Sequence, residues 1–557
     1  LRSCRLCDPV TVDARVEDLA ARGRAALAGG DHVGARAAFD AALQLRESPE
    51  VLFGLAQAVH LSGDCHQAGA LYDRAFQAYR ADGQHLAAAR VARIRAYQCH
   101  LDGDWTLAGG WLARARRLVT DHGGTDGVEH QWLELFDAMA DGDVPRRERR
   151  LRAVAAAAGR LGDANLECDA LGVLGQLCVA VGRVEEGMAL LDEALTAVCA
   201  GEVDEWVVVE GAFCLMLSAC EITQDVTRAQ RWVRSGDEVV AGRGVTSVGA
   251  LCRGYYGGIL LAAGRYPEAE RTLMDAARGL QHGYDLARRT ALARLADVRV
   301  RQGRLEEAAQ LLDGLEEHAD AAHPMAALHL ARGEHAMARD RIQRALPSAT
   351  GVTAARLLAL LVEVHIAEGD VAAAGAVAEQ LADQVRQPRT AHLRGTVALT
   401  RGRVARVTTS ADAVTWLRQA VTAFADAGMP LELAVSRLEM ARTVAATQPQ
   451  VAVAEATSAL RIFEELDAAR LTDQAAALLR QLGAPVRVGP KGVGALTKRE
   501  EEVLSLLGHG LSNPEIAERL VISRKTVEHH VGRVLMKLGL RNRAEAAALA
   551  VRRPEVS

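Results

Sequence analysis

The chain has 557 residues, of which 50% are apolar, 25% charged and 4% aromatic, and its formal net charge is -5. This composition is typical of folded globular proteins and excludes disordered or collagen-like chains. At about 100–200 residues per domain, the length predicts about three to five domains, or one long repeat array with a small module. The ten cysteines lack the spacing of a disulfide framework, so we expect reduced, mostly buried thiols.

The first part of the chain shows no pattern typical of a metal site or a membrane segment. Cys4 and Cys7 form one CxxC pair, but no second pair and no His at ligand spacing accompany it, so zinc or redox chemistry is disfavoured. Charge-free apolar stretches, such as Gly211 to Cys220, are shorter than the ~18–20 residues that span a bilayer. The sequence therefore predicts a cytoplasmic protein without a metal or a cofactor.

A repeated pattern occupies most of residues 1–482. A Gly-Asp or Gly-Arg step is followed by a small residue five positions on, a bulky apolar residue nine positions on, and often by Ala at twelve. The first copy consists of Gly30, Ala35, Phe39 and Ala42. Further copies begin at Gly63, Gly103, Gly182, Gly264, Gly303, Gly333 and Gly369, with degenerate copies at Gly142 and Gln224. The spacing between successive copies is typical of stacked helix pairs.

The residue types of the repeat fit helix pairs. Gly can end one helix in a left-handed conformation, and the small residue lets the next helix approach its partner closely. The pattern resembles tetratricopeptide repeats, although most of its periods exceed the ~34 residues of that family. We expect an α-solenoid, closed by amphipathic helices at 414–424 and 454–466, that presents a surface to a peptide, a protein or a second copy. The six Trp and residues such as His66 and His100 either line a binding groove or pack inside, and packing is the more common role.

The charge distribution marks a separate C-terminal module. All four lysines of the chain lie at or after Lys491. From that residue onward, four Lys and eight Arg oppose eight Glu and no Asp, a net charge of +4 that leaves -9 for residues 1–490. Residues 483–494 contain four Gly and two Pro, which no packed helix would tolerate, and are predicted to be a linker. A basic module therefore follows an acidic body.

Four short helices are predicted after the linker. Capping boxes mark helix starts and glycines mark helix ends. The expected starts are capping boxes at Thr497–Glu500 and Ser512–Glu515 and a third start at Ser523. The expected ends are the glycines at 508, 510 and 539. The third helix then covers about 524–538 and the fourth about 542–551, which suggests a helix-turn-helix fold.

When the third of these helices is projected at 100° per residue, its side chains separate into two different faces. One sector collects apolar residues that must pack inward, namely Val527, Val531, Val534, Leu535 and Leu538. The opposite sector is centred on Lys525, His529, Gly532 and Met536, with Glu528 and Arg533 on its flanks and Thr526, His530 and Lys537 further round. A basic, outward-facing helix after a tight turn can read the DNA major groove. An ordinary solvated charged face is the alternative.

The stretch from Leu496 to Val551 resembles the LuxR-type helix-turn-helix family of transcriptional regulators. The matching segments are residues 496–504, 510–517, 522–531 and 537–546. The resemblance implies sequence-specific binding of double-stranded DNA by the third helix, and a homodimer formed by the fourth helix around 544–551, with half-sites about one DNA turn apart.

The resemblance also implies roles for seven residues. Base reading falls to Glu528, His529 and Gly532, and phosphate contacts fall to Lys525, Thr526, Arg533 and Lys537. Family members often carry a basic residue at the position of Gly532, so we expect Glu528 and His529 to dominate base reading. The expected organisation is all-α: a tetratricopeptide-like α-solenoid (1–482), the linker (483–494) and a four-helix LuxR-type domain (495–557).

Several functions remain open for the chain as a whole. The combination of a helical-repeat body and a C-terminal LuxR-type domain resembles the large ATP-binding regulators of the LuxR family. Those regulators bind nucleotide through a P-loop, yet no G-x-x-x-x-G-K-[ST] motif occurs here and no Lys precedes residue 491. Either a nucleotide-binding domain lies upstream of Leu1 or it has been lost. No G-x-S-x-G, H-E-x-x-H or Rossmann glycine motif appears, so we expect no catalytic site and no enzyme. A DNA-binding transcriptional regulator, whose body senses an effector, binds partners or oligomerises, is favoured over a peptide-binding repeat scaffold.

Overall fold

The computed structural model describes residues 9–123, 126–241, 247–281, 283–385, 390–484, 496, 498–538, 540 and 542–552. Across these ranges the regular elements are all helices, and no strand occurs among them. The all-α fold predicted from the sequence is confirmed. The chain divides into two compact units, one with residues 1–263, 267–291 and 387–390 and the other with residues 264–266, 292–386 and 391–557.

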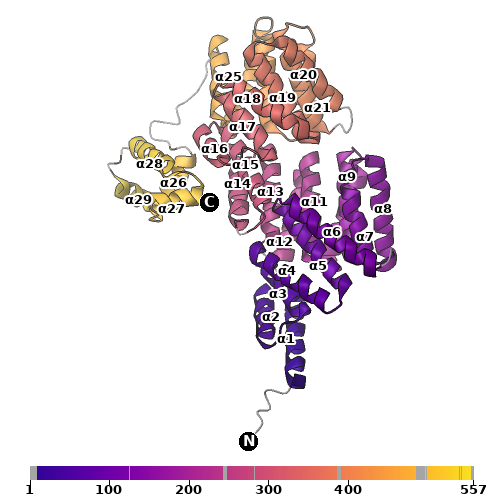
Figure 1. The fold of residues 1–557 in the computed structure, drawn as a ribbon. Coiled ribbons are helices and arrows are strands. Elements are labelled where there is room, and N and C mark those ends of the chain that lie inside the picture. Colours follow the sequence, from indigo (N-terminus) through magenta and orange to yellow (C-terminus); the bar gives the residue numbers. More distant parts are fainter. Residues whose placement is uncertain are drawn as a thin grey trace. The chain divides into compact units, whose positions relative to one another are not determined.

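The first unit holds a long series of helices, labelled in Figure 1. They are α1 Pro9–Gly29, α2 His32–Leu45, α3 Pro49–Leu61, α4 Cys65–Ala81, α5 His85–Leu101, α6 Trp105–His122, α7 Val128–Met139, α8 Val144–Leu161, α9 Ala164–Ala180, α10 Val184–Ala200, α11 Trp206–Thr223, α12 Val226–Ala241 and α13 Ser247–Ala262. Residues of α14 Tyr266–Gly279 and α15 Asp285–Gln302 belong to both units.

The second unit continues the series and ends in the C-terminal module. Its body helices are α16 Leu305–Leu312, α17 Ala322–Ala331, α18 His335–Ala345, α19 Gly351–Glu368, α20 Val371–Gln384, α21 Ala391–Val407, α22 Ala413–Asp426, α23 Pro430–Val444, α24 Pro449–Glu465 and α25 Ala469–Gln481, with 3-10 turns at Ala319–Ala321 and Leu346–Ser348. The module holds α26 Lys498–Gly508, α27 Asn513–Leu520, α28 Arg524–Leu538 and α29 Arg543–Arg552. The predicted linker lies almost wholly outside the described residues.

The turns of the repeat have the conformation that the sequence predicts. All eight marker glycines have a positive φ, between 74° and 94°, and the degenerate marker Gln224 also has φ 59°. The Asp of the Gly-Asp step adds a feature that the pattern alone did not reveal: it caps the following helix. Asp31, for example, accepts the N–H of Gly34 at 2.7 Å, and Asp64 accepts the N–H of Gln67 at 3.0 Å. Each such junction therefore ends one helix and starts the next within two or three residues.

The small residues of the repeat lie where helices approach most closely. Ala35 and the alanines at the same position of the later copies are buried, and Gly187 takes this position in α10. A Cβ at Gly187 would lie 2.4 Å from the carbonyl oxygen of Gly175 in α9. Since no side chain fits there, only glycine allows this α9–α10 contact. Leu112 departs from the pattern, because it is only partly buried and its neighbour Trp111 packs inside instead.

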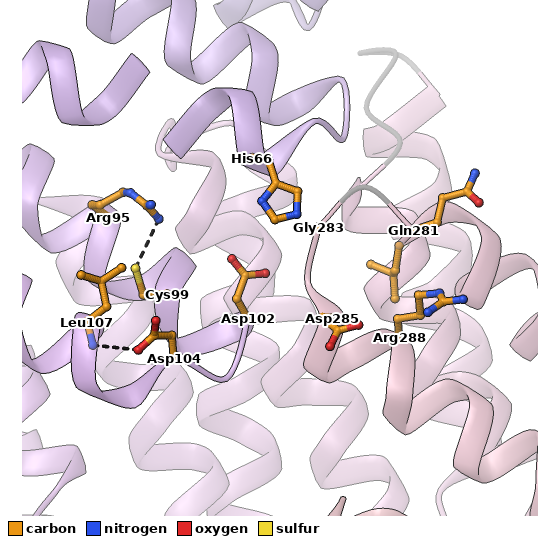
Figure 2. A pocket seen from close by; sticks show the side chains of 11 residues that line it. His66, Arg95, Cys99, Asp102, Asp104, Leu107, Gln281, Gly283, Asp285 and Arg288 are labelled. Atoms are coloured by element: carbon orange, nitrogen blue, oxygen red, sulfur yellow. Dashed lines mark hydrogen bonds between the residues drawn. The ribbon is translucent and has the colours of Figure 1, made fainter. Parts of the chain in front are cut away.

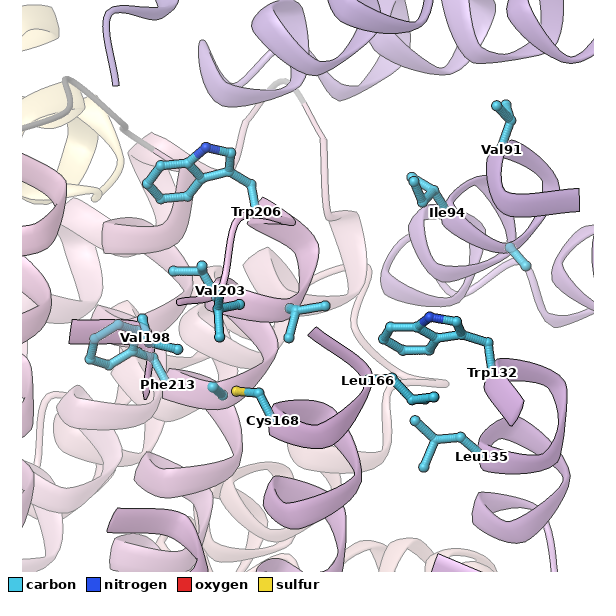
Figure 3. Close-up of a cluster of buried hydrophobic side chains, with 14 of the residues drawn as sticks. Val91, Ile94, Trp132, Leu135, Leu166, Cys168, Val198, Val203, Trp206 and Phe213 are labelled. Atoms are coloured by element: carbon cyan, nitrogen blue, oxygen red, sulfur yellow. The ribbon is translucent and has the colours of Figure 1, made fainter. Parts of the chain in front are cut away.

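A large cluster of buried apolar side chains extends through the first unit, and Figure 3 shows part of it. Trp132, 2% exposed, packs in it beneath the guanidinium of Arg93, whose Cζ lies 3.9 Å from the ring centroid. Arg93 also donates to both oxygens of the buried Glu205 at 3.1 Å. Trp132 therefore packs inside, the role that the sequence favoured for its tryptophans, whereas Trp105 is 60% exposed.

Helix α11 is the one described helix that is long and apolar enough to cross a membrane by composition. However, 56% of it is buried inside the protein, and its residue Glu210 is fully buried. These features are typical of the core helix of a folded domain.

Candidate nucleic-acid interface

The C-terminal module has its own apolar core, to which all four helices contribute. Its fully buried members are Val503 and Leu507 of α26, Ile516 of α27, Val527 and Val534 of α28, and Ala546 of α29. The apolar face predicted for the third helix is thus confirmed, with Val531 also buried and Leu535 and Leu538 partly buried. This core fixes which side of α28 points outward.

Local hydrogen bonds set the start of α27. Ser512 and Glu515 form the predicted capping box: the Ser512 N–H donates to Glu515 Oε2 at 2.6 Å, and the Glu515 N–H donates to Ser512 Oγ at 3.5 Å. The Ser512 hydroxyl also donates to Glu515 Oε2 at 2.6 Å. Because these bonds favour the ionised form, they lower the pKa of Glu515. The other predicted capping box includes Thr497, which lies outside the described residues.

The turn between α27 and α28 is short and strained. Val521 has φ 52° and ψ 54°, a left-handed conformation that is costly for a β-branched residue. Ser523 then starts α28 by accepting the N–H of Thr526 on its hydroxyl at 3.1 Å. On the other side of the turn, the buried Arg499 of α26 donates to the carbonyl oxygen of Leu520 at 3.1 Å. Sequence reasoning missed both Val521 and Arg499, since neither residue type signals a turn.

The outward face of α28 carries most of the residues predicted for DNA contact. Lys525, His529, Gly532 and Arg533 are exposed, and one turn beyond Gly532 the side chain of Met536 is 73% exposed. A Cβ built at Gly532 meets no atom within 4 Å. Glycine at this position is therefore not required by the packing of the protein itself.

Two further predicted contact residues, Glu528 and Thr526, also make hydrogen bonds near the start of α28, and a third, Lys537, is described only in its backbone. Glu528 is exposed but accepts a hydrogen bond from the Nε–H of Arg524 at 3.0 Å, within the same helix. Thr526 is only partly exposed, and its hydroxyl lies 2.8 Å from that of Ser523, so its side chain also serves the helix start. Lys537 belongs to α28, but its side chain lies outside the described residues.

Helix α29 is held to the module by an arginine that sequence reasoning did not single out. Arg543 donates to Asn513 Oδ1 at 2.5 Å and to the carbonyl oxygen of Leu511. With Ala546 buried beneath it, the helix leaves Ala544 and Ala548 exposed one turn apart. These small residues lie on the surface where dimerisation was predicted.

Comparisons with known proteins identify the module. Residues 494–550 match the family of bacterial regulatory proteins of the luxR type. The chain is 53% identical over 57 residues to the transcriptional regulatory protein LnrK of Bacillus subtilis, and 43% identical over 77 residues to the DNA-binding transcriptional activator DevR/DosR of Mycobacterium tuberculosis. These segments cover 10% and 14% of this chain and 26% and 35% of those proteins. The predicted resemblance to the LuxR-type family is confirmed for this module.

A longer relative and a solved structure were also found. The putative HTH-type transcriptional regulator Rv0890c of Mycobacterium tuberculosis is 44% identical over 87 residues, which are 15% of this chain and 10% of that protein. The chain is also similar to one in the crystal structure of the APC/C hetero-tetramer Cut9-Hcn1, with a TM-score of 0.37 and 14% identity over 84% of this chain and 97% of the other.

Proposed function

Because residues 494–550 form a helix-turn-helix domain of the luxR family, we propose that the protein is a sequence-specific transcriptional regulator that places α28 in the major groove of DNA. The observation that carries this proposal is the separation of faces on α28. Its valines are buried in the module, while Lys525, His529 and Arg533 are exposed on the other side. A helix presented in this way can meet both phosphates and base edges.

The proposal divides the seven predicted contact residues by chemistry. His529 and Glu528 read bases, since an imidazole can donate to base edges and a carboxylate can accept from cytosine N4. Lys525, Thr526, Arg533 and Lys537 contact phosphates and position the helix. Gly532 lets the DNA approach the helix closely.

The proposal also assigns roles to the rest of the chain, and none of them is catalytic. The relatives are transcriptional regulators, so the proposal includes no enzymatic step and places the protein in the cytoplasm with its DNA. The repeat body would sense an effector, bind partner proteins or oligomerise, because stacked helix pairs present extended surfaces. The exposed alanines of α29 would form a homodimer, so that two copies meet half-sites about one DNA turn apart.

The test compares two single substitutions in the full chain. A preferred duplex is first selected from a random pool, and affinities for it and for a scrambled duplex are then measured by fluorescence anisotropy at several salt concentrations. His529→Ala should weaken binding to the preferred duplex about 5- to 150-fold and leave the scrambled duplex unaffected, because a lost base contact costs about 1–3 kcal/mol. Lys525→Ala should weaken both duplexes equally and reduce the salt slope by about 0.9.

Arg461→Ala provides the matched control, since it removes one exposed positive charge from α24 in the body. It should change neither affinity. Equal effects of His529→Ala on both duplexes would contradict the assigned role of that residue. The absence of salt-dependent binding to any duplex would overturn the DNA-binding function itself.

A further inference from the structure

A polar cavity of about 440 Å³ lies in the first unit, between the α5–α6 turn and the segment that leads into α15 (Figure 2). We infer that this cavity binds a small zwitterion, an α-amino acid with an aliphatic side chain. The inference goes beyond the proposed DNA binding and is independent of it. The inference rests on carboxylates and an arginine that line the same cavity and still have atoms free to form hydrogen bonds with a ligand.

Two carboxylates form one side of the cavity. Asp102 accepts the N–H of Tyr284 on Oδ1 at 2.8 Å, and Asp104 accepts the N–H of Leu107 on Oδ1 at 2.9 Å. Among the described residues, each carboxylate has this single hydrogen bond, which leaves its Oδ2 available. An ammonium group needs such acceptors, because it carries three N–H donors and no acceptor.

A cation faces the cavity from a different element. Arg288, in the first turn of α15, is half-buried, and its Nε is shielded from solvent without a hydrogen-bond partner among the described residues. The other arginine of the cavity, Arg95, is already engaged by Asp73 at 3.1 Å and by Cys99 Sγ at 3.2 Å. Figure 2 shows Asp102 and Asp104 at the α5–α6 turn and Arg288 on α15, on the other side of the cavity and next to Asp285. Arg288 is therefore the group that can bind a ligand carboxylate.

The wall that carries Arg288 is anchored in the core. Tyr284, just before α15, is buried with φ 58°, and its hydroxyl lies 2.9 Å from His60 Nε2 and donates to Glu210 Oε2 at 3.0 Å. A Cβ at Gly283 would lie 2.4 Å from Cys65 Cβ, so the backbone there is pressed against α4. A site on such a fixed segment needs little ordering when a ligand binds.

The chemistry of the lining selects the ligand class. A simple anion would meet the two aspartates and a simple amine would meet Arg288, whereas a zwitterion satisfies both. Leu280 and the 44%-exposed Leu107 add an apolar surface beside these charges. That combination fits an ammonium, a carboxylate and an aliphatic side chain on one small molecule.

The test is isothermal titration calorimetry of the full chain with L-leucine, L-leucine amide and N-acetyl-L-leucine. L-leucine should bind, while the amide, which lacks the carboxylate, and the acetylated form, which lacks the ammonium, should bind at least about tenfold more weakly, the equivalent of one lost ionic contact. Absence of L-leucine binding at ligand concentrations up to about 10 mM, roughly tenfold above a 1 mM Kd, would overturn the inference.

Substitutions then locate the binding site. Arg288→Gln should make L-leucine and its amide bind alike. Asp104→Asn leaves Asp102 in place, so it should reduce the difference between L-leucine and its acetylated form, while Asn still caps α6. Arg278→Gln is the control, because that exposed arginine pairs with Asp275 on α14, outside the cavity lining. Binding that survives both test substitutions unchanged would refute the site. DNA affinity is measured separately, so failure here leaves the proposed DNA binding unaffected.

Discussion

Gly532→Ala should stabilise α28 in the free protein and weaken its complex with DNA. Glycine inside a helix costs about 0.5–1 kcal/mol relative to alanine. Because a Cβ at this position meets no atom within 4 Å, nothing in the protein opposes that gain. Bound DNA would meet the added methyl group if it approaches the helix at Gly532, and a forced close contact costs about 1–3 kcal/mol, or about 5- to 150-fold in affinity.

The two effects are measured on the same full-length variant. Native-state hydrogen exchange followed by mass spectrometry should show protection of α28 amides rising about 2- to 5-fold, which corresponds to the expected gain in local stability. Fluorescence anisotropy with the preferred duplex should show the loss of affinity. Gly109→Ala in α6 is the control, since a Cβ there also meets nothing within 4 Å. It should protect α6 similarly and leave DNA binding unchanged.

Either of two results would refute the reasoning about Gly532. Reduced protection of α28 amides in Gly532→Ala would mean that the added methyl group clashes with other atoms of the protein. Unchanged or tighter DNA binding, together with increased protection, would mean that DNA does not approach this position, and the assignment of the outward face to base reading would then be wrong.

Two further predictions concern stability. Gly187→Ala should lower the thermal unfolding midpoint, because its Cβ would lie 2.4 Å from the Gly175 carbonyl oxygen and overpacking costs about 1–3 kcal/mol. Gly110→Ala in α6, where a Cβ meets no atom within 4 Å, should instead raise the midpoint. Shifts of the same sign would contradict the close α9–α10 contact. Burial lowers the pKa of His323 to about 3 in the folded protein. As the pH falls below about 6.5, this histidine is therefore protonated in the unfolded chain but not in the folded one. The free energy of unfolding should then decrease by up to about 1.4 kcal/mol per pH unit. His323→Gln should reduce this acid sensitivity in thermal melts between pH 7 and pH 5, and an unchanged pH profile would exclude that histidine as its source.

Features encoded by neighbouring residues could be predicted from the sequence. The capping box of Ser512 and Glu515 acts across three positions, so its residues define the start of α27 without reference to the rest of the fold. The bounds of α28 and its buried valines follow from the 3.6-residue period in the same way. The marker glycines adopted the predicted left-handed conformation because glycine has no competing steric penalty there.

Features that depend on distant residues could not be predicted. The hydroxyl of Tyr284 meets His60, 224 positions away, and only the folded chain brings them together. Val521 adopts a left-handed conformation that its own side chain disfavours, so packing on both sides of the turn must impose it. The contact of Gly532 with DNA and the dimer surface of α29 remain predictions, since both concern molecules beyond this chain.

The paired glycine and aspartate at the repeat junctions bear on how a chain of this kind can change in length. Gly30 satisfies the end of α1 and Asp31 the start of α2, so this junction needs no help from distant parts of the protein. Duplication or deletion of a segment from one such glycine to the next would leave no helix end without its hydrogen bonds. Such a repeat array can therefore gain or lose whole helix pairs more easily than single helices.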